Sequence, residues 1–134
     1  MPSICRNHFR AIAVVISCTF GLAIAGPASA QTIGEGAFVG KSGHATSGGV
    51  AVNRSGEGYK IEFGADFSFD GAPDPKVGFG RGGAYDRAST LAPLASNSGA
   101  QSYNVPPSVD AEAYDEVYVW CEQYSVPLGV AKIK

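Results

Sequence analysis

The feature that most constrains the fold is a series of short segments in which apolar and polar residues alternate between glycine-rich turns. Val50–Val52 and Tyr59–Phe63 are the clearest pair, and the polar connection Asn53–Gly58 between them predicts a β-hairpin. No segment has the pattern of a long amphipathic helix. About seven to nine short antiparallel strands predict an all-β single domain, a β-sandwich or a partly closed barrel. The other predicted strands are Ala37–Val39, Phe67–Phe69, Lys76–Gly80, Ala100–Val105, Glu116–Glu122 and Leu128–Ile133.

The connections between these strands carry their own signals. Two prolines within Gly71–Pro75 predict a turn, because each proline fixes its own φ and keeps the residue before it out of the helical region. A short strand or turn is expected around Leu91 and Leu94, within a loose glycine-rich region. Val109–Tyr114 is expected to form a short helical turn or an irregular crossing.

The predicted strand Glu116–Glu122 contains the only tryptophan of the chain. A strand points successive side chains to opposite faces, so Cys121 shares its face with two valines while Trp120 faces the other way. Those valines favour burial of the thiol. Trp120 is expected to anchor the packing, and its truncation to Ala would cost about 3–5 kcal/mol if it is buried.

The N-terminal segment has the pattern of an export signal. Arg6 and Arg10 supply a basic start, Ala11–Ala25 supplies an apolar run, and Ala28-Ser29-Ala30 is a small-residue cleavage site. The sequence therefore predicts a signal peptide over residues 1–30 and one β domain over residues 31–134.

Cleavage after Ala30 would deliver the protein to the periplasm or the outside of the cell. A minor alternative is a lipoprotein, because Val15-Ile16-Ser17-Cys18 loosely fits a lipidation box that would attach lipid to Cys18. No later stretch approaches the about 20 apolar residues of a membrane span. No membrane span is therefore expected in the mature chain.

Charge narrows the class of partner. Without residues 1–30, eight Lys and Arg face twelve Asp and Glu in 104 residues, which gives a net charge of −4. Nucleic acids and anionic lipids favour clustered basic residues, so neither is expected as the main partner. An extracytoplasmic protein, including a redox partner, is the class of partner that remains.

Cysteine content excludes a disulfide-stabilised fold. Cys5 and Cys18 lie in the predicted signal peptide, so the mature chain keeps Cys121 alone and forms no intramolecular disulfide. A single thiol in an oxidising compartment is buried and inert, paired with another chain, or reactive. The sequence leaves these three alternatives open.

Few residues suit catalysis or metal binding. His44 is the only histidine of the mature chain, and no Gly-x-Ser-x-Gly motif accompanies it, so a hydrolase triad is not expected. Structural zinc needs about four Cys or His ligands, and the mature chain has one of each. Copper or haem iron held by His44 and Cys121 is a minor alternative, and the sequence requires no cofactor. An enzyme is the less favoured class, and no catalytic residue is identified.

Three blocks of sequence resemble one known family. The first is Gly36-Ala37-Phe38 with His44 and Ser47-Gly48, and the second is Asp66-Phe67 with Gly71 and Pro73-Asp74. The third is Gly99-Ala100-Gln101-Ser102-Tyr103 and Val105-Pro106, with Tyr114-Asp115, Val117, Val119-Trp120-Cys121 and Gly129-Val130-Ala131. These blocks resemble the DM-thirteen domain family. Its members are small extracytoplasmic modules, found alone in bacterial exported proteins and beside DOMON and cytochrome-type membrane domains in animals.

The resemblance implies a β-rich domain whose cysteine, here Cys121, acts in redox chemistry or electron transfer. Two hypotheses follow. The first is a redox module that acts through Cys121, with His44 and Trp120 as candidate neighbours. The alternative is a non-enzymatic extracytoplasmic binding or surface-interaction module in which Cys121 is part of the core.

Overall fold

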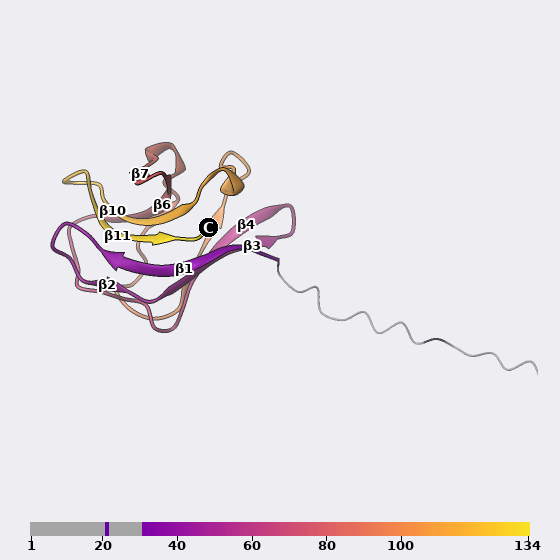
Figure 1. Cartoon of the computed structure of the whole chain (residues 1–134), viewed down its shortest axis with the longest axis horizontal. Coiled ribbons are helices and arrows are strands. Elements are labelled where there is room, and N and C mark those ends of the chain that lie inside the picture. Colours follow the sequence, from indigo (N-terminus) through magenta and orange to yellow (C-terminus); the bar gives the residue numbers. More distant parts are fainter. Residues whose placement is uncertain (1–20, 22–30) are drawn as a thin grey trace, which may run out of the picture.

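The structure is a computed structural model that describes residue 21 and residues 31–134. Apart from Gly21, the predicted signal peptide lies outside the described residues. The described part of the chain is all-β, as the sequence predicts (Figure 1). Its elements are β1 (Thr32–Gly40), β2 (Thr46–Ser47), β3 (Gly49–Ser55), β4 (Gly58–Phe63), β5 (Ser68–Phe69), β6 (Pro75–Arg81), β7 (Ala84–Tyr85), the 3₁₀ turn η1 (Arg87–Ser89), β8 (Ala92–Pro93), β9 (Gln101–Val105), the 3₁₀ turn η2 (Ala111–Ala113), β10 (Glu116–Cys121) and β11 (Val126–Lys132).

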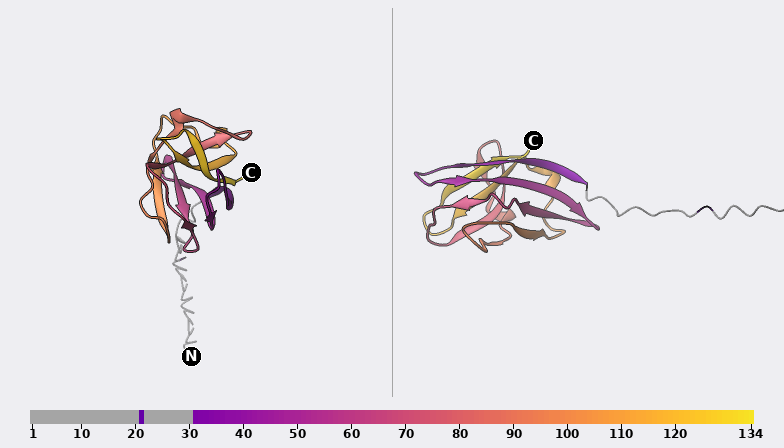
Figure 2. Two further views of the ribbon diagram at one scale, coloured as in Figure 1. Left: turned by 90° about the vertical axis from the view of Figure 1, so that its left-hand side faces the viewer. Right: turned by 90° about the horizontal axis from the view of Figure 1, so that it is seen from below.

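One curled antiparallel sheet forms most of the molecule. Its strand order is β7-β6-β10-β11-β1-β3-β4-β9. The short strand β8 also pairs with β6. The sheet bends into an open half-barrel, which corresponds to the partly closed barrel among the predicted alternatives (Figure 2). The short strands β2 and β5 form a second small sheet.

The hairpin of β3 and β4 is confirmed, with a shorter connection than predicted. Asn53 pairs with Lys60 and Arg54 pairs with Tyr59, so residues expected in the loop belong to the ladder. Only Gly56 and Glu57 remain between the strands, and Gly56 has a φ of +59° that favours glycine.

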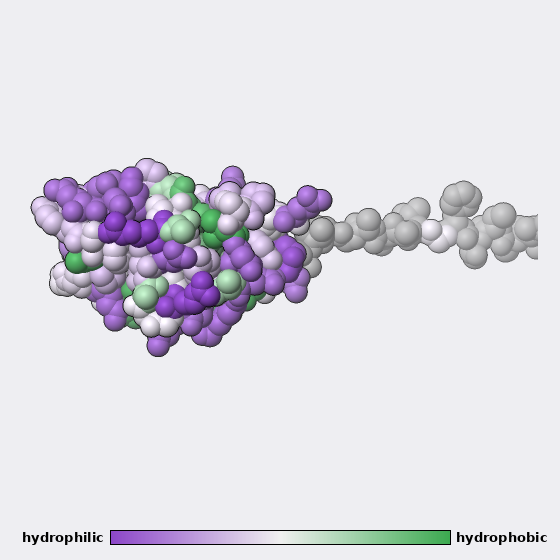
Figure 3. Space-filling view, turned by 90° about the horizontal axis from the view of Figure 1, so that it is seen from above, coloured by the Kyte–Doolittle hydropathy of each residue, from purple (hydrophilic) through white to green (hydrophobic). Residues whose placement is uncertain are grey.

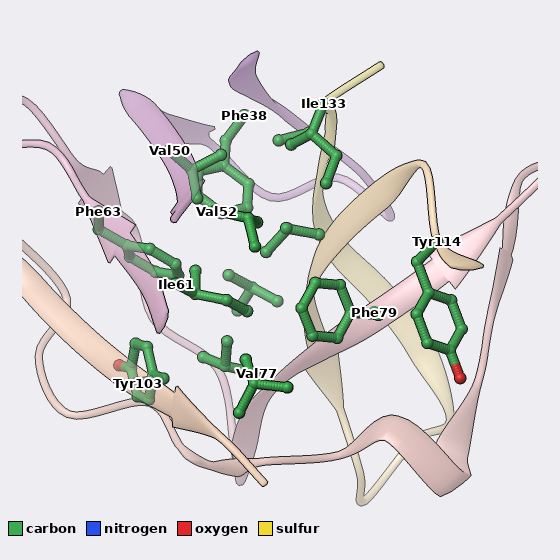
Figure 4. Close-up of a cluster of buried hydrophobic side chains, with 14 of the residues drawn as sticks. Phe38, Val50, Val52, Ile61, Phe63, Val77, Phe79, Tyr103, Tyr114 and Ile133 are labelled. Carbon is green, nitrogen blue, oxygen red and sulfur yellow. The ribbon is translucent and has the colours of Figure 1, made fainter. Parts of the chain in front are cut away.

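The inner face of the half-barrel holds a single hydrophobic core. Val52, Ile61, Val77 and Phe79 are fully buried, and they come from strands on both sides of β1 (Figure 4). Phenylalanine rings extend the core, since the ring centroids of Phe38 and Phe63 lie 4.9 Å apart. Burial of this apolar surface is the main stabilising contribution available to a chain that has no disulfide in its described part.

The outer surface is mostly polar. The face shown in Figure 3 is predominantly hydrophilic, with small separate apolar spots. Among the described residues, the exposed large hydrophobic side chains are Val39 and Tyr124. Few large apolar side chains of the described residues are therefore left exposed.

Strand β1 joins the two halves of the sheet. Its residues up to Ala37 pair with β3, and its residues from Phe38 onward pair with β11. Strand β1 passes very close to the end of β11, because a Cβ atom on Gly36 would lie 1.9 Å from the carbonyl oxygen of Lys132. Gly40 is constrained in the same way, since a Cβ atom there would lie 2.0 Å from the His44 carbonyl oxygen. Only glycine allows the backbones to approach so closely at these positions.

Strand β10 lies between β6 and β11 and is buried on both faces. Val117, Val119 and Cys121 belong to the main core, which confirms the face predicted for them. On the other face Tyr118 is also buried, beneath the hairpin of β6 and β7. Trp120 was expected to anchor the packing, but it is only half-buried, so only part of its ring packs against the protein. Its ring lies at the margin of this second layer, where Tyr85 covers one side of it.

Candidate functional site

Cys121 ends β10 and lies at the edge of the core. Its residue is 1% exposed, and its Sγ donates a hydrogen bond to the carbonyl oxygen of Pro73 at 3.2 Å. Glu122 continues the contact, since its amide donates to the carbonyl oxygen of Asp74 at 3.2 Å. Pro73 and Asp74 are themselves exposed. On one side, the thiol therefore lies against a segment of backbone that reaches the surface.

That covering segment has a strained backbone. Asp74 has a φ of +49°, in the left-handed region that non-glycine residues rarely occupy. An ion pair of 2.9 Å between Asp74 and Lys76 lies next to it. Strand β6 begins at Pro75, opposite Cys121. Local opening of Pro73–Lys76 would thus uncover the sulfur without breaking the centre of the sheet.

Trp120 lies on the opposite face of β10 from Cys121. Its ring stacks on Tyr85 with a centroid separation of 4.5 Å and an interplanar angle of 15°. The guanidinium of Arg87 lies 5.9 Å from the ring centroid, on the solvent side of the cluster. The indole Nε1 is buried and has no hydrogen-bond partner among the described residues. Trp120 is thus a neighbour of Cys121 along the strand but does not share its environment.

A cluster of polar groups, which the sequence interpretation missed, lies further along β10 on the same face as Trp120. Tyr118 donates a hydrogen bond from its hydroxyl to Glu116 Oε2 at 2.9 Å. The Gly83 amide donates to both carboxylate oxygens, at 3.0 and 3.2 Å. Burial, followed by the hydrogen bond to Glu116, raises the pKa of the Tyr118 hydroxyl. The available signal was the alternation itself, which places Glu116 and Tyr118 beside Trp120 on one face.

His44 belongs to a different part of the molecule. Its ring Nδ1 donates to Asp70 Oδ1 at 2.9 Å, and its ring centroid lies 5.9 Å from that of Phe69. These contacts link the ends of β2 and β5. In the described part of the chain, no hydrogen bond or ion pair connects His44 with Cys121, and no group of three or more His, Cys, Asp or Glu is arranged to hold a metal ion.

The pair of His44 and Asp70 predicts a pH dependence of stability. The hydrogen bond from the Ala45 amide, followed by the bond from His44, lowers the pKa of the Asp70 carboxyl. A lowered pKa in the folded state means that this stabilisation is present above the unfolded value of about 3.9 and is lost as the pH falls through the folded value. We expect Asp70→Asn to lower the urea midpoint at neutral pH.

The same measurement at low pH is the control. The difference in urea midpoint between the wild type and Asp70→Asn is expected to shrink between about pH 5 and pH 2, where the wild-type carboxylate takes up its proton. A difference that stays constant over this range would contradict the assigned role of the carboxylate. Chemical denaturation followed by Trp120 fluorescence provides the readout.

Comparison with known proteins gives one match. A family model described as electron transfer DM13 matches residues 37–133, which is most of the chain. No curated protein and no solved structure gives a significant match. Among the described residues, no helix is long and apolar enough to cross a membrane.

Proposed function

The chain belongs to the electron transfer DM13 family, and from this membership we propose that it is an extracytoplasmic redox domain that acts through Cys121. The observation that carries the proposal is the family match, which spans both Cys121 and the segment that covers it. The contact between Cys121 and Pro73 supports it further, because it joins the Trp-Cys block to the Pro-Asp block. Residues 1–30 act as the signal peptide in this proposal, and residues 31–134 form the exported domain.

The chemistry proposed for Cys121 is thiol–disulfide exchange with a partner protein. When Pro73–Lys76 opens, the thiol loses its proton to solvent and its sulfur attacks a disulfide of the partner. A new S–S bond forms between Cys121 and the partner, and the second sulfur of the partner leaves as a thiolate. The departing sulfur of the partner is reduced to a thiolate, and Cys121 is oxidised as it enters the mixed disulfide with the other partner sulfur.

Access to the sulfur is the property to be measured. We expect Cys121 in the folded protein to form a mixed disulfide with oxidised glutathione through local opening, at a rate nearly independent of urea at low concentration. Intact mass spectrometry measures the adduct over time. In fully unfolded protein the reaction is expected to be at least about 100-fold faster, which corresponds to an opening free energy of about 2.7 kcal/mol.

A matched control places the thiol deeper in the same strand. Val119→Cys combined with Cys121→Ser moves the sulfur two residues along β10, to a fully buried position on the same face. That thiol is expected to react only through global unfolding, with a strong urea dependence. The same urea dependence for Cys121 would rule out a redox role through local opening.

A second candidate function is favoured by the burial of Cys121. With 1% of its surface exposed, the residue contributes to the core as a small hydrophobic side chain. In this alternative the domain is a non-enzymatic extracytoplasmic binding or surface-interaction module. It predicts that Cys121→Ser lowers stability while the folded wild type forms no glutathione adduct.

A further inference from the structure

On the face of β10 opposite Cys121, two rings of β10 and one ring of β7 form a row of aromatic side chains that the proposed thiol chemistry does not use. The ring centroids of Tyr118 and Tyr85 lie 5.4 Å apart, and those of Tyr85 and Trp120 lie 4.5 Å apart. Tyr118 is 2% exposed, whereas Trp120 is half-buried and reaches the surface beside Arg87. The three rings therefore connect a buried phenol with the protein surface.

Strand β6 is shaped to accommodate these rings. A Cβ atom on Gly80 would lie 2.4 Å from Cε2 of Tyr118, and a Cβ atom on Gly78 would lie 2.7 Å from the hydroxyl oxygen of Tyr85. Gly78 pairs directly with Tyr118 across the sheet. The hairpin of β6 and β7 folds over β10 (Figure 1). Tyr118 is buried beneath it, with its ring against that of Tyr85 in β7. The rings are thus held in place by packing that a side chain at either glycine would disturb.

Glu116 supplies a base at the buried end of this row of rings. The residue is 3% exposed, and within the described part of the chain no cationic group lies at ion-pair distance from its carboxylate. Lys41, Lys132 and Lys134 line the same cavity of about 630 Å³, and none of them forms an ion pair with Glu116. The carboxylate accepts hydrogen bonds from the Gly83 amide and from the Tyr118 hydroxyl, so its Oε2 lies 2.9 Å from the phenol oxygen as the nearest proton acceptor.

We propose that Tyr118 is a redox-active tyrosine that passes its proton to Glu116 when it loses an electron. A one-electron oxidant that docks over Trp120 accepts the electron, which travels through Tyr85 and Trp120. The O–H bond of Tyr118 breaks, and its proton binds Oε2 of Glu116. The products are a neutral tyrosyl radical, a neutral carboxylic acid and the reduced oxidant, and return of the electron reverses every step. The inference extends the redox role proposed above with a second site that is independent of Cys121.

A second tyrosine and carboxylate pair serves as an internal comparison. Tyr114 donates a hydrogen bond to Asp86 Oδ2 at 2.6 Å. That bond, followed by the bond from the Ala88 amide, lowers the pKa of the Asp86 carboxyl, which makes it a weaker proton acceptor. The Tyr114 ring stacks on Phe79 rather than on the Tyr85 and Trp120 rings. Tyr114 therefore has a similar hydrogen bond without the route to Trp120.

Flash oxidation of the full chain tests the proposal. A photogenerated ruthenium(III) complex serves as the oxidant, and transient absorption and electron paramagnetic resonance detect the tyrosyl radical. We expect a radical in the wild type and its loss in Tyr118→Phe, whereas the matched variants Tyr114→Phe and Tyr124→Phe keep it. A radical of unchanged yield in Tyr118→Phe would overturn the assignment.

The role of Glu116 has its own readout. Glu116→Gln keeps the shape of the side chain but removes the base, and it is expected to slow radical formation at least about 100-fold, the lower end of the contribution of a positioned acid or base. The solvent deuterium isotope effect on radical formation is expected to change in the same variant. An unchanged rate and isotope effect would show that Glu116 does not take the proton.

Two further samples protect the test from misinterpretation. Incorporation of 3-fluorotyrosine at position 118 keeps the hydroxyl and the packing, so fluorine splitting of the resonance signal identifies the radical even if Tyr118→Phe folds poorly. Absence of that splitting would overturn the proposal. Cys121→Ser is expected to retain the radical, so failure of the proposed thiol chemistry and failure of this inference give different results.

Discussion

Truncation of Phe79 to Ala is expected to lower the free energy of unfolding by about 3–5 kcal/mol. Phe79 is fully buried in β6, and its ring stacks on Tyr114 with a centroid separation of 5.2 Å. The truncation would open a cavity in the core and remove this stacked contact. Small domains have a total stability of about 5–15 kcal/mol, so a large share would be lost. Urea titration with circular dichroism detection measures the change.

Tyr124→Ala is the control for this truncation. Tyr124 is 63% exposed, so loss of its ring is expected to change the free energy of unfolding by no more than about 0.5 kcal/mol. A cost for Phe79→Ala as small as that for Tyr124→Ala would mean that the inner face of the half-barrel does not close around Phe79.

Gly36→Ala is expected to destabilise the fold by about 1–3 kcal/mol or more, in spite of adding only one methyl group. The added Cβ would lie 1.9 Å from the Lys132 carbonyl oxygen. That oxygen belongs to the backbone, so no flexible side chain can move to relieve the clash. Strand β1 would have to move away from β11 at the crossing. The amide of Glu35, which donates to the Ile133 carbonyl oxygen at 3.0 Å, is expected to lose hydrogen-exchange protection.

Gly49→Ala is the matched control, since Gly49 lies in the neighbouring strand β3 and pairs with Ala37. The nearest atoms to an added Cβ there lie 3.8 and 3.9 Å away, at ordinary contact distance, and its φ does not require glycine. The variant is expected to fold with a urea midpoint close to that of the wild type. Equal losses for the two substitutions would attribute the effect to strand propensity rather than to the crossing of β1 and β11.

Local patterns in the sequence predict the strands well but not their arrangement. Alternation identified the β3 and β4 hairpin and the core face of β10, because both depend on neighbours along the chain. The predicted short strand near Leu91 and the turn within Val109–Tyr114 correspond to β8 and η2. The pairing of β1 with both β3 and β11 joins residues far apart in the sequence, and no local pattern encodes it.

In the candidate site, too, features set by neighbours along the chain were predictable and features set by distant residues were not. Burial of Cys121 follows from its face on the strand, and the structure confirms it. The partial exposure of Trp120 was not predictable, because it depends on where the hairpin of β6 and β7 ends over the outer face. The partner of His44 is Asp70, 26 residues away, and only the small second sheet brings them together.

The open half-barrel leaves β9 with a ladder partner on one side, β4, within the described chain. An unpaired edge strand can form a ladder with a strand of another molecule, and such pairing can start aggregation. Pro106 and Pro107 follow β9 directly and lack the backbone N–H that a growing ladder needs. The two prolines thus limit the length of the edge on which another strand could add.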